Sequence, residues 1–122
     1  MLTELGKDLA ALLVPEGILR DFEIKKVESE PSGGCIIHLE EKEGLPYIPK
    51  AILHEGKAIA NGFCNPIELL SFPANGKPLY LKIFRRRWRI RGTNRTASNS
   101  YQFNYPGMKT TKAFGDFLKG EI

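Results

Sequence analysis

The sequence of 122 residues contains only two cysteines, Cys35 and Cys64. Two cysteines cannot form a disulfide framework or a four-thiolate zinc site, so we expect free thiols, no metal and no other cofactor. No stretch approaches the roughly 18 consecutive apolar residues of a membrane-spanning helix, so we expect no membrane partner. Glu4 and Asp8 lie near the start, where a secretory signal would have a basic region, and this favours a cytoplasmic location.

Known catalytic motifs are also missing. The sequence has no GxSxG, P-loop, HExxH or GxGxxG pattern, and neither His38 nor His54 stands in a nucleophile motif. Acidic residues, which general acid–base and metal chemistry need, are absent from residues 69–115. We therefore expect no catalytic residue and no enzymatic activity of the chain alone.

Charge divides the sequence into two parts. Residues 1–68 contain 7 Lys/Arg and 12 Asp/Glu, whereas residues 69–115 contain 10 Lys/Arg and no acidic residue. Charges of one sign repel one another, so the basic part favours a polyanion as partner. The alternative is a basic hairpin that is merely solvated. The change in charge does not coincide with a linker, and we expect a single DNA-binding domain over residues 1–122.

The acidic front part predicts one helix and two strands. Leucines at helical spacing predict a short amphipathic helix over 2–13. Alternating patterns predict strands over 21–28 and 34–41, with Cys35 facing the core and His38 facing outward. The second strand ends in an acidic cluster that we expect to be a solvated edge, formed by Glu40, Glu41 and Glu43.

The middle of the chain and the basic part predict a hairpin. Residues 51–60 are expected to form one or two helical turns. Asn75-Gly76 separates apolar runs at 67–72 and 79–91, which is a strong hairpin signal. In the second strand the apolar face becomes an arginine face at Arg85, so the strand must leave the core there or twist at a bulge. The simplest picture is a basic ribbon that projects from the domain.

The last part of the chain predicts a polar loop and a helix. Residues 101–103 are expected to form a short return strand. Thr110 or Thr111 caps a final helix that carries Phe114 and Phe117 on one side. The expected fold is therefore α+β, an antiparallel sheet with a projecting basic β-hairpin and short helices at both ends.

The basic residues are the candidate DNA contacts. Arginine suits phosphate because its planar fork makes two charge-assisted hydrogen bonds, and a two-stranded ribbon fits the major groove. The aromatic ring of the tryptophan is expected either to anchor the ribbon or to stack on bases. The candidate residues are Lys77, Lys82, Arg85, Arg86, Arg87, Trp88, Arg89, Arg91, Arg95, Lys109 and Lys112.

Several segments together resemble the N-terminal region of insertion-sequence transposases of the DDE type. They are the acidic strand pair FEIKKVESEPSGGCIIHLEEKE, the run GKPLYL after Phe72-Pro73, the run RRRW at 85–88, and the pattern G-x-x-x-T-x-x-F-x-x-F-L-K from Gly107 to Lys119. The resemblance covers roughly residues 12–122. Some relatives carry a zinc ribbon here with two CxxC pairs, and this sequence has neither pair.

The resemblance implies a function in transposition. In split members of the family this region is a separate small protein, and the next reading frame encodes the catalytic subunit. The chain is then expected to bind double-stranded DNA at the terminal inverted repeats of the mobile element, next to the catalytic transposase subunit, in the nucleoid. Two alternatives are a module that docks onto that subunit, and a general RNA- or single-strand-binding protein.

Overall fold

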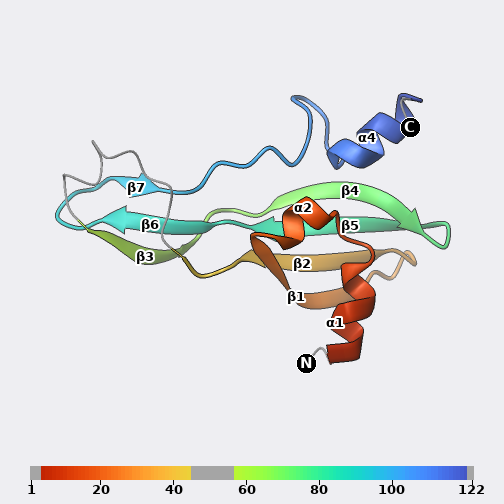
Figure 1. Ribbon diagram of the computed structural model, residues 1–122, viewed down its shortest axis with the longest axis horizontal. Helices are drawn as coiled ribbons and strands as arrows, with labels where there is room; N and C mark the ends of the chain where they lie inside the picture. Colours follow the sequence, from red (N-terminus) through yellow and green to blue (C-terminus); the bar gives the residue numbers. More distant parts are fainter. Residues whose placement is uncertain (1–3, 45–56, 121–122) are drawn as a thin grey trace.

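A computed structural model describes residues 4–44 and 57–120. Its elements are α1 (Glu4–Ala11), α2 (Glu16–Leu19), β1 (Phe22–Ser29), β2 (Cys35–Glu41), β3 (Ala58–Phe63), β4 (Ile67–Ala74), β5 (Lys77–Phe84), β6 (Arg86–Ile90), β7 (Thr96–Ala97) and α4 (Lys112–Leu118). They form a four-stranded sheet of order β1-β2-β5-β4 and a three-stranded sheet of order β3-β6-β7. Figure 1 shows the two sheets following each other along the long axis of the molecule. The expected α+β class is confirmed.

Both hairpins of the four-stranded sheet follow from the sequence. β1 pairs antiparallel with β2, and β4 pairs antiparallel with β5. Asn75 and Gly76 have positive φ angles of 53° and 74°, as the favoured two-residue hairpin turn requires. The two hairpins meet through their second strands, and β2 therefore pairs parallel with β5. The sheet is thus antiparallel except at its centre.

The core lies between the four-stranded sheet and the N-terminal helices. Leu79, Leu81 and Ile83 alternate along β5 and are at most 1% exposed. Ala10 from α1 and Ile18 from α2 are buried in the same cluster. None of the helices within the described ranges is both long and apolar enough to span a membrane.

The apolar side of the first helix differs from the expectation. α1 ends at Ala11, and Leu9, Leu12 and Leu13 are exposed by 58%, 81% and 41%. Val14, just after the helix, is buried instead. The expected helix over 2–13 is therefore shorter at its C-terminal end, and residues 1–3 lie outside the described residues.

Two expected elements in the rest of the chain were wrong. Of the helical turns expected over 51–60, residues 51–56 lie outside the described residues, and Ala58–Ala60 belong to β3 because they pair with β6. Residues 101–103 form no strand, since β7 takes the place beside β6. The rings of Tyr101 and Phe103 instead pack on Phe22, with centroids 5.0 and 5.5 Å away.

The C-terminal segment closes the free edge of β4. The backbone of Leu70 exchanges hydrogen bonds with Lys109 and Thr111, at 2.9 and 3.0 Å. Thr111 then caps α4, because its hydroxyl oxygen accepts a hydrogen bond from the backbone N–H of Phe114. The expected helix cap is confirmed. Phe114 is buried, whereas Phe117 is 52% exposed.

Candidate nucleic-acid interface

The arginine-rich segment forms the central strand of the three-stranded sheet. β6 pairs with β3 along most of its length and with the short β7 on its other side. Beyond β6, the N–H of Arg91 donates to the carbonyl oxygen of Lys57 at 2.8 Å. The basic segment is therefore not a two-stranded hairpin, because β3, from earlier in the chain, pairs with it. Figure 1 shows this sheet at the end of the molecule, beyond the four-stranded sheet.

One face of β6 is cationic and the other is buried. Arg87 and Arg89 are exposed, whereas Trp88 and Ile90 between and beyond them are 6% and 0% exposed. The predicted alternation is confirmed. Arg91 and Arg95, in the segment after the strand, are also exposed.

The exposed arginines have little compensation from the protein. Arg87 Nε donates to the carbonyl oxygen of Asn61 at 3.1 Å. Among residues 4–44 and 57–120, no carboxylate lies within ion-pair distance of Arg87, Arg89 or Arg91. The segments that build the sheet, 57–64 and 86–97, contain no acidic residue. The positive potential of this face is therefore not cancelled within its own sheet.

The first two arginines of the run are bound to the protein itself. Arg85 lies between β5 and β6, where the apolar face was expected to end, and its Nη1 donates to the carbonyl oxygen of Asn99 at 3.2 Å. The guanidinium carbon of Arg86 lies 5.2 Å from the centroid of the Phe63 ring. Both arginines are only partly exposed and join the two sheets.

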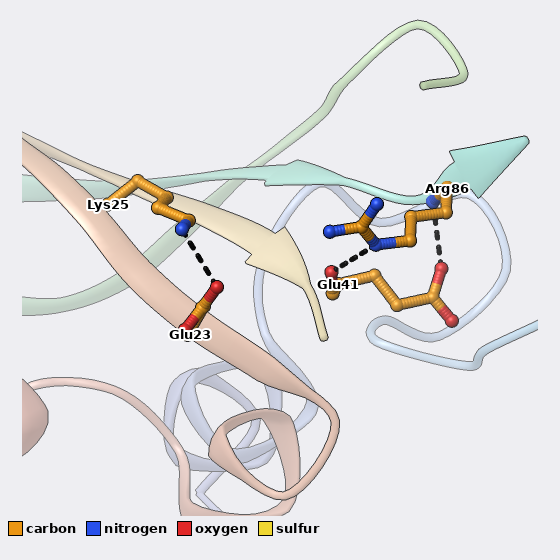
Figure 2. Close-up of polar contacts among 4 residues, drawn as sticks. All are labelled: Glu23, Lys25, Glu41 and Arg86. Atoms are coloured by element: carbon orange, nitrogen blue, oxygen red, sulfur yellow. Dashed lines mark hydrogen bonds and ion pairs between the residues drawn. The ribbon is translucent and has the colours of Figure 1, made fainter. Parts of the chain in front are cut away.

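Glu41 at the end of β2 is the centre of this junction. Its side chain accepts hydrogen bonds from the Arg86 backbone N–H, from Asn99 Nδ2 and from the Tyr101 hydroxyl, at 2.8, 2.7 and 2.5 Å. Its carbonyl oxygen accepts a further bond from Arg86 Nε at 2.8 Å. Figure 2 shows the two bonds between Glu41 and Arg86. Four donors therefore converge on one residue.

The expectation that the acidic cluster is a solvated edge was wrong for Glu41, which is 3% exposed. The alternation contained the signal, since Ile37 and Leu39 face the core and Glu41 continues the same face. A buried carboxylate needs polar partners, and residues 86–101 supply them. Glu43 is exposed, as expected.

The surroundings of Glu41 shift the pKa of the Tyr101 hydroxyl. Burial raises the pKa of Tyr101 well above its ordinary value, and the hydrogen bond to Glu41 and the charge of that carboxylate raise the pKa further. The neutral phenol is therefore the stable form, because it donates to a carboxylate that would repel a phenolate.

Trp88 anchors the three-stranded sheet. Its side chain is buried and borders a cavity of about 230 Å³ together with Glu41, Asn99 and Tyr101. Of the two roles expected for this ring, packing is the one observed. Stacking on bases would require the ring to leave this position.

The lysines do not join the arginine face, the name we give to the surface of the exposed residues Arg87, Arg89 and Arg91. Lys77 begins β5, at the end of the four-stranded sheet that lies far from β6 in Figure 1. Lys82 lies on β5 with its Nζ 5.9 Å from the centroid of the Phe84 ring. Lys109 borders β4, and Lys112 Nζ is 3.4 Å from Gln102 Oε1. The structure therefore exposes Arg87, Arg89 and Arg91 in sequence on and just after β6, with the backbone of Arg95 beside Ile90, and leaves the four lysines elsewhere.

Among residues 4–44 and 57–120, the remaining candidate ligands do not form a metal site. Cys35 packs against the core, as expected, and burial raises the pKa of its thiol. His38 faces away from the core and its ring is stacked with that of Phe84. The described part of the chain holds no group of three His, Cys, Asp or Glu side chains that could bind a metal ion. His54 lies outside that part.

Comparisons with known proteins found no relative that indicates a function. No family model, no curated protein and no solved structure matches the chain significantly. The resemblance to transposase N-terminal regions therefore rests on the sequence motifs alone.

Proposed function

We propose that the chain is a non-catalytic module that binds double-stranded DNA through the exposed face of β6. The observation that carries this proposal is the row of Arg87 and Arg89 on β6 and Arg91 directly after it, all exposed at a sheet without acidic residues. Residues two apart on a strand are separated by roughly 6.6 Å, so the arginines form a line of positive charge. Such a line suits the regularly spaced phosphates of a nucleic-acid backbone.

The biological setting that we propose is transposition. The motifs from Gly76 to Trp88 and from Gly107 to Lys119 are the basis, because they resemble the N-terminal region of split DDE transposases. The DNA would then be the terminal inverted repeats of an insertion sequence, and the protein partner would be the separately encoded catalytic subunit. The corresponding location is the nucleoid in the cytoplasm.

The DNA-binding proposal is tested by the salt dependence of binding to a terminal-repeat duplex. Each phosphate contact adds about 0.9 to the slope of log K against log salt. The variant Arg87→Gln/Arg89→Gln/Arg91→Gln is expected to lower the magnitude of this slope by about 2.7 and to weaken binding roughly 100-fold at low salt. The matched control is Lys25→Gln/Lys26→Gln/Lys42→Gln, which neutralises three exposed cations on β1 and just after β2. Equal losses in both variants would show that net charge, and not this face, drives binding.

A second candidate function is docking onto a protein, and one cluster favours it. Phe72, Phe117 and Leu118 are exposed by 39%, 52% and 58%, and the two phenylalanine rings lie 5.5 Å apart. An exposed apolar patch of this kind is typical of a protein contact. Co-purification with the catalytic subunit, compared between wild type and Phe117→Ser/Leu118→Ser, separates this function from DNA binding.

A further inference from the structure

The four-stranded sheet has a face that points away from the N-terminal helices and the core. We call it the outer face. It carries Ile36, His38 and Glu40 from β2, Tyr80, Lys82 and Phe84 from β5, and Glu68 and Leu70 from β4, which alternate with the core residues of the same strands. The strand register places Tyr80 between Ile36 and Leu70, and Lys82 between His38 and Glu68. All of the β2 and β5 side chains on this face are partly exposed.

Aromatic rings and cations are connected across this face. The Phe84 ring lies 6.2 Å from the ring of His38, nearly parallel to it, and 6.2 Å from the ring of Phe63. Lys82 Nζ is 5.9 Å from the centroid of Phe84, and Arg86 lies over Phe63. This series of contacts runs from the centre of the four-stranded sheet to the start of the arginine strand.

A groove lies next to the aromatic series. It has a volume of about 630 Å³, and its lining includes Tyr80, Lys82, Leu70, Lys109 and Thr110 as well as the acidic residue Glu68. This volume is within the usual range for small-molecule sites. The Thr110 hydroxyl oxygen is buried and has no hydrogen-bond partner among the described residues.

The cations of the groove form no ion pair with a described residue, whereas those at the sheet edge do. Lys25 and Lys26 on β1 are paired with Glu23 and Glu28, at 2.8 and 3.0 Å, and Figure 2 shows the first of these pairs. No carboxylate in the ranges 4–44 and 57–120 lies within ion-pair distance of Lys82 or Lys109. Lys82 stands between the two aromatic side chains of its strand, Tyr80 and Phe84.

We infer that the outer face binds an unpaired nucleic-acid strand, with bases stacked on Tyr80 and Phe84 and phosphates at Lys82 and Lys109. Aromatic side chains on a sheet, interleaved with cations, are the features that recognise unpaired bases, since every base has a π-face. Tyr80 and Phe84 are roughly 13 Å apart along the strand, so two bases fit with the intervening backbone at Lys82. A duplex cannot use these rings, because its bases are stacked on one another.

This site is separate from the duplex-binding face and does not depend on it. The rings belong to β5 and β3, whereas the exposed arginines belong to β6 and the segment after it. Arg86 and Phe63 join the two surfaces, so a single strand on the outer face would lead toward the arginine face. Stacking on unpaired bases was expected from the sequence at Trp88 or Phe84; the inference keeps Phe84, adds Tyr80 and leaves out Trp88, which is buried.

The test compares binding of ten-residue thymidine and uridine oligonucleotides to wild type and to Tyr80→Leu, Phe84→Leu and Lys82→Gln, measured by fluorescence anisotropy. Each leucine variant is expected to weaken binding roughly 10-fold, because each removes one stacking ring. Lys82→Gln is expected to lower the salt slope by about 0.7, the value of one phosphate contact on a single strand. Thermal unfolding of every variant verifies that the fold is kept, and Tyr80→Phe, which keeps the ring, should restore the affinity.

Two controls make the result decisive. Phe117→Leu removes an exposed ring of α4 that contacts Phe72 and not Tyr80 or Phe84, and should leave oligonucleotide binding unchanged. Arg89→Gln/Arg91→Gln should weaken duplex binding far more than oligonucleotide binding. The inference is overturned if Tyr80→Leu binds like wild type, if Phe117→Leu loses as much, or if only the arginine variant loses oligonucleotide affinity. If wild type does not bind duplex DNA but binds the oligonucleotides, and Tyr80→Leu weakens that binding, the proposed function is wrong and the single-strand site is supported.

Discussion

The two sheets share a nearly continuous strand and use it differently. In β5, Leu79, Leu81 and Ile83 are almost fully buried beneath the N-terminal helices. In β6, which begins two residues after β5 ends, the exposed face carries Arg87 and Arg89. The four-stranded sheet therefore contains most of the hydrophobic core, and the three-stranded sheet presents charge to the solvent.

The strand passes from the four-stranded to the three-stranded sheet at Arg85, and the buried carboxylate of Glu41 holds this junction. The inward positions are odd-numbered in β5 and even-numbered in β6, so the two strands cannot be one regular strand. Arg85 interrupts them, and Glu41 binds the backbone and the side chain of Arg86. Arginines in one run thus have two roles: the first two hold the sheets together, and the later ones remain exposed.

The largest effect is expected from Glu41→Ala, which would break the connection between the two sheets. The variant leaves the Arg86 N–H, the Asn99 amide and the Tyr101 hydroxyl without their acceptor, so the free energy of unfolding should fall by about 3–5 kcal/mol. Urea denaturation measures this change. Glu43→Ala, at an exposed position nearby, is the control and should stay within about 0.5 kcal/mol of wild type. Similar values for the two variants would contradict the structural role of Glu41.

The two classes of arginine are compared by Arg86→Gln and Arg89→Gln. Arg86→Gln removes the bond from Nε to the Glu41 carbonyl and the contact with Phe63, and should lower stability by about 2 kcal/mol. Arg89→Gln should change stability by less than about 0.5 kcal/mol but should weaken duplex binding. Thermal unfolding and a duplex titration on the same samples measure both. If Arg89→Gln is the more destabilising of the two, the division of roles is wrong.

Tyr101→Phe tests the junction through its pH dependence. Removing the hydroxyl should lower stability at neutral pH by about 1.5 kcal/mol, since a bond to a buried carboxylate is lost. The pKa of Tyr101 is raised in the folded protein, so its contribution is fully present below about pH 10 and is lost as the pH rises above that value. Unfolding midpoints between pH 8 and 11 should therefore fall more steeply for wild type than for Tyr101→Phe. Tyr80→Phe, on the outer face, is the control and should keep the steep alkaline loss.

The smallest effect is expected from Lys77→Gln. Lys77 lies in the hairpin turn region of the four-stranded sheet, at the end away from β6, so its charge is too distant to meet DNA on the arginine face. Duplex affinity should change less than about 2-fold, whereas Arg91→Gln should lower the salt slope by about 0.9. Equal slopes for the two variants would show that DNA covers both sheets.

Local patterns predicted the hairpins, the cap of α4 and the alternation of β6. Local sequence favours the turn at Asn75-Gly76, the cap at Thr111 and the alternation of Trp88 with Ile90. Tertiary contacts did not override these local preferences. The helical turns expected around Ala58–Ala60 and the return strand at 101–103 were wrong for the opposite reason. Their conformations depend on which distant strand pairs with β6, and that choice has no local signal.

The candidate site was only partly predictable. Exposure of Arg87, Arg89 and Arg91 followed from period-two alternation, because a charged side chain without a partner stays in water. The hydrogen bonds that hold Arg85 and Arg86 to the protein could not be predicted, because their partners Asn99 and Glu41 lie 14 and 45 residues away. Identical residues in one run cannot be told apart by composition.

The order of amino acids by itself determined the strand periods, the tight turn and the separation of acidic from basic charge. These properties arise from backbone geometry and side-chain chemistry within a few positions of each residue. Only the tertiary structure decided that Glu41 is buried, that Trp88 is covered, and that aromatic rings from β2, β3 and β5 meet on one face. Those outcomes depend on contacts between segments that are remote along the chain, and such contacts are established only when the whole core forms.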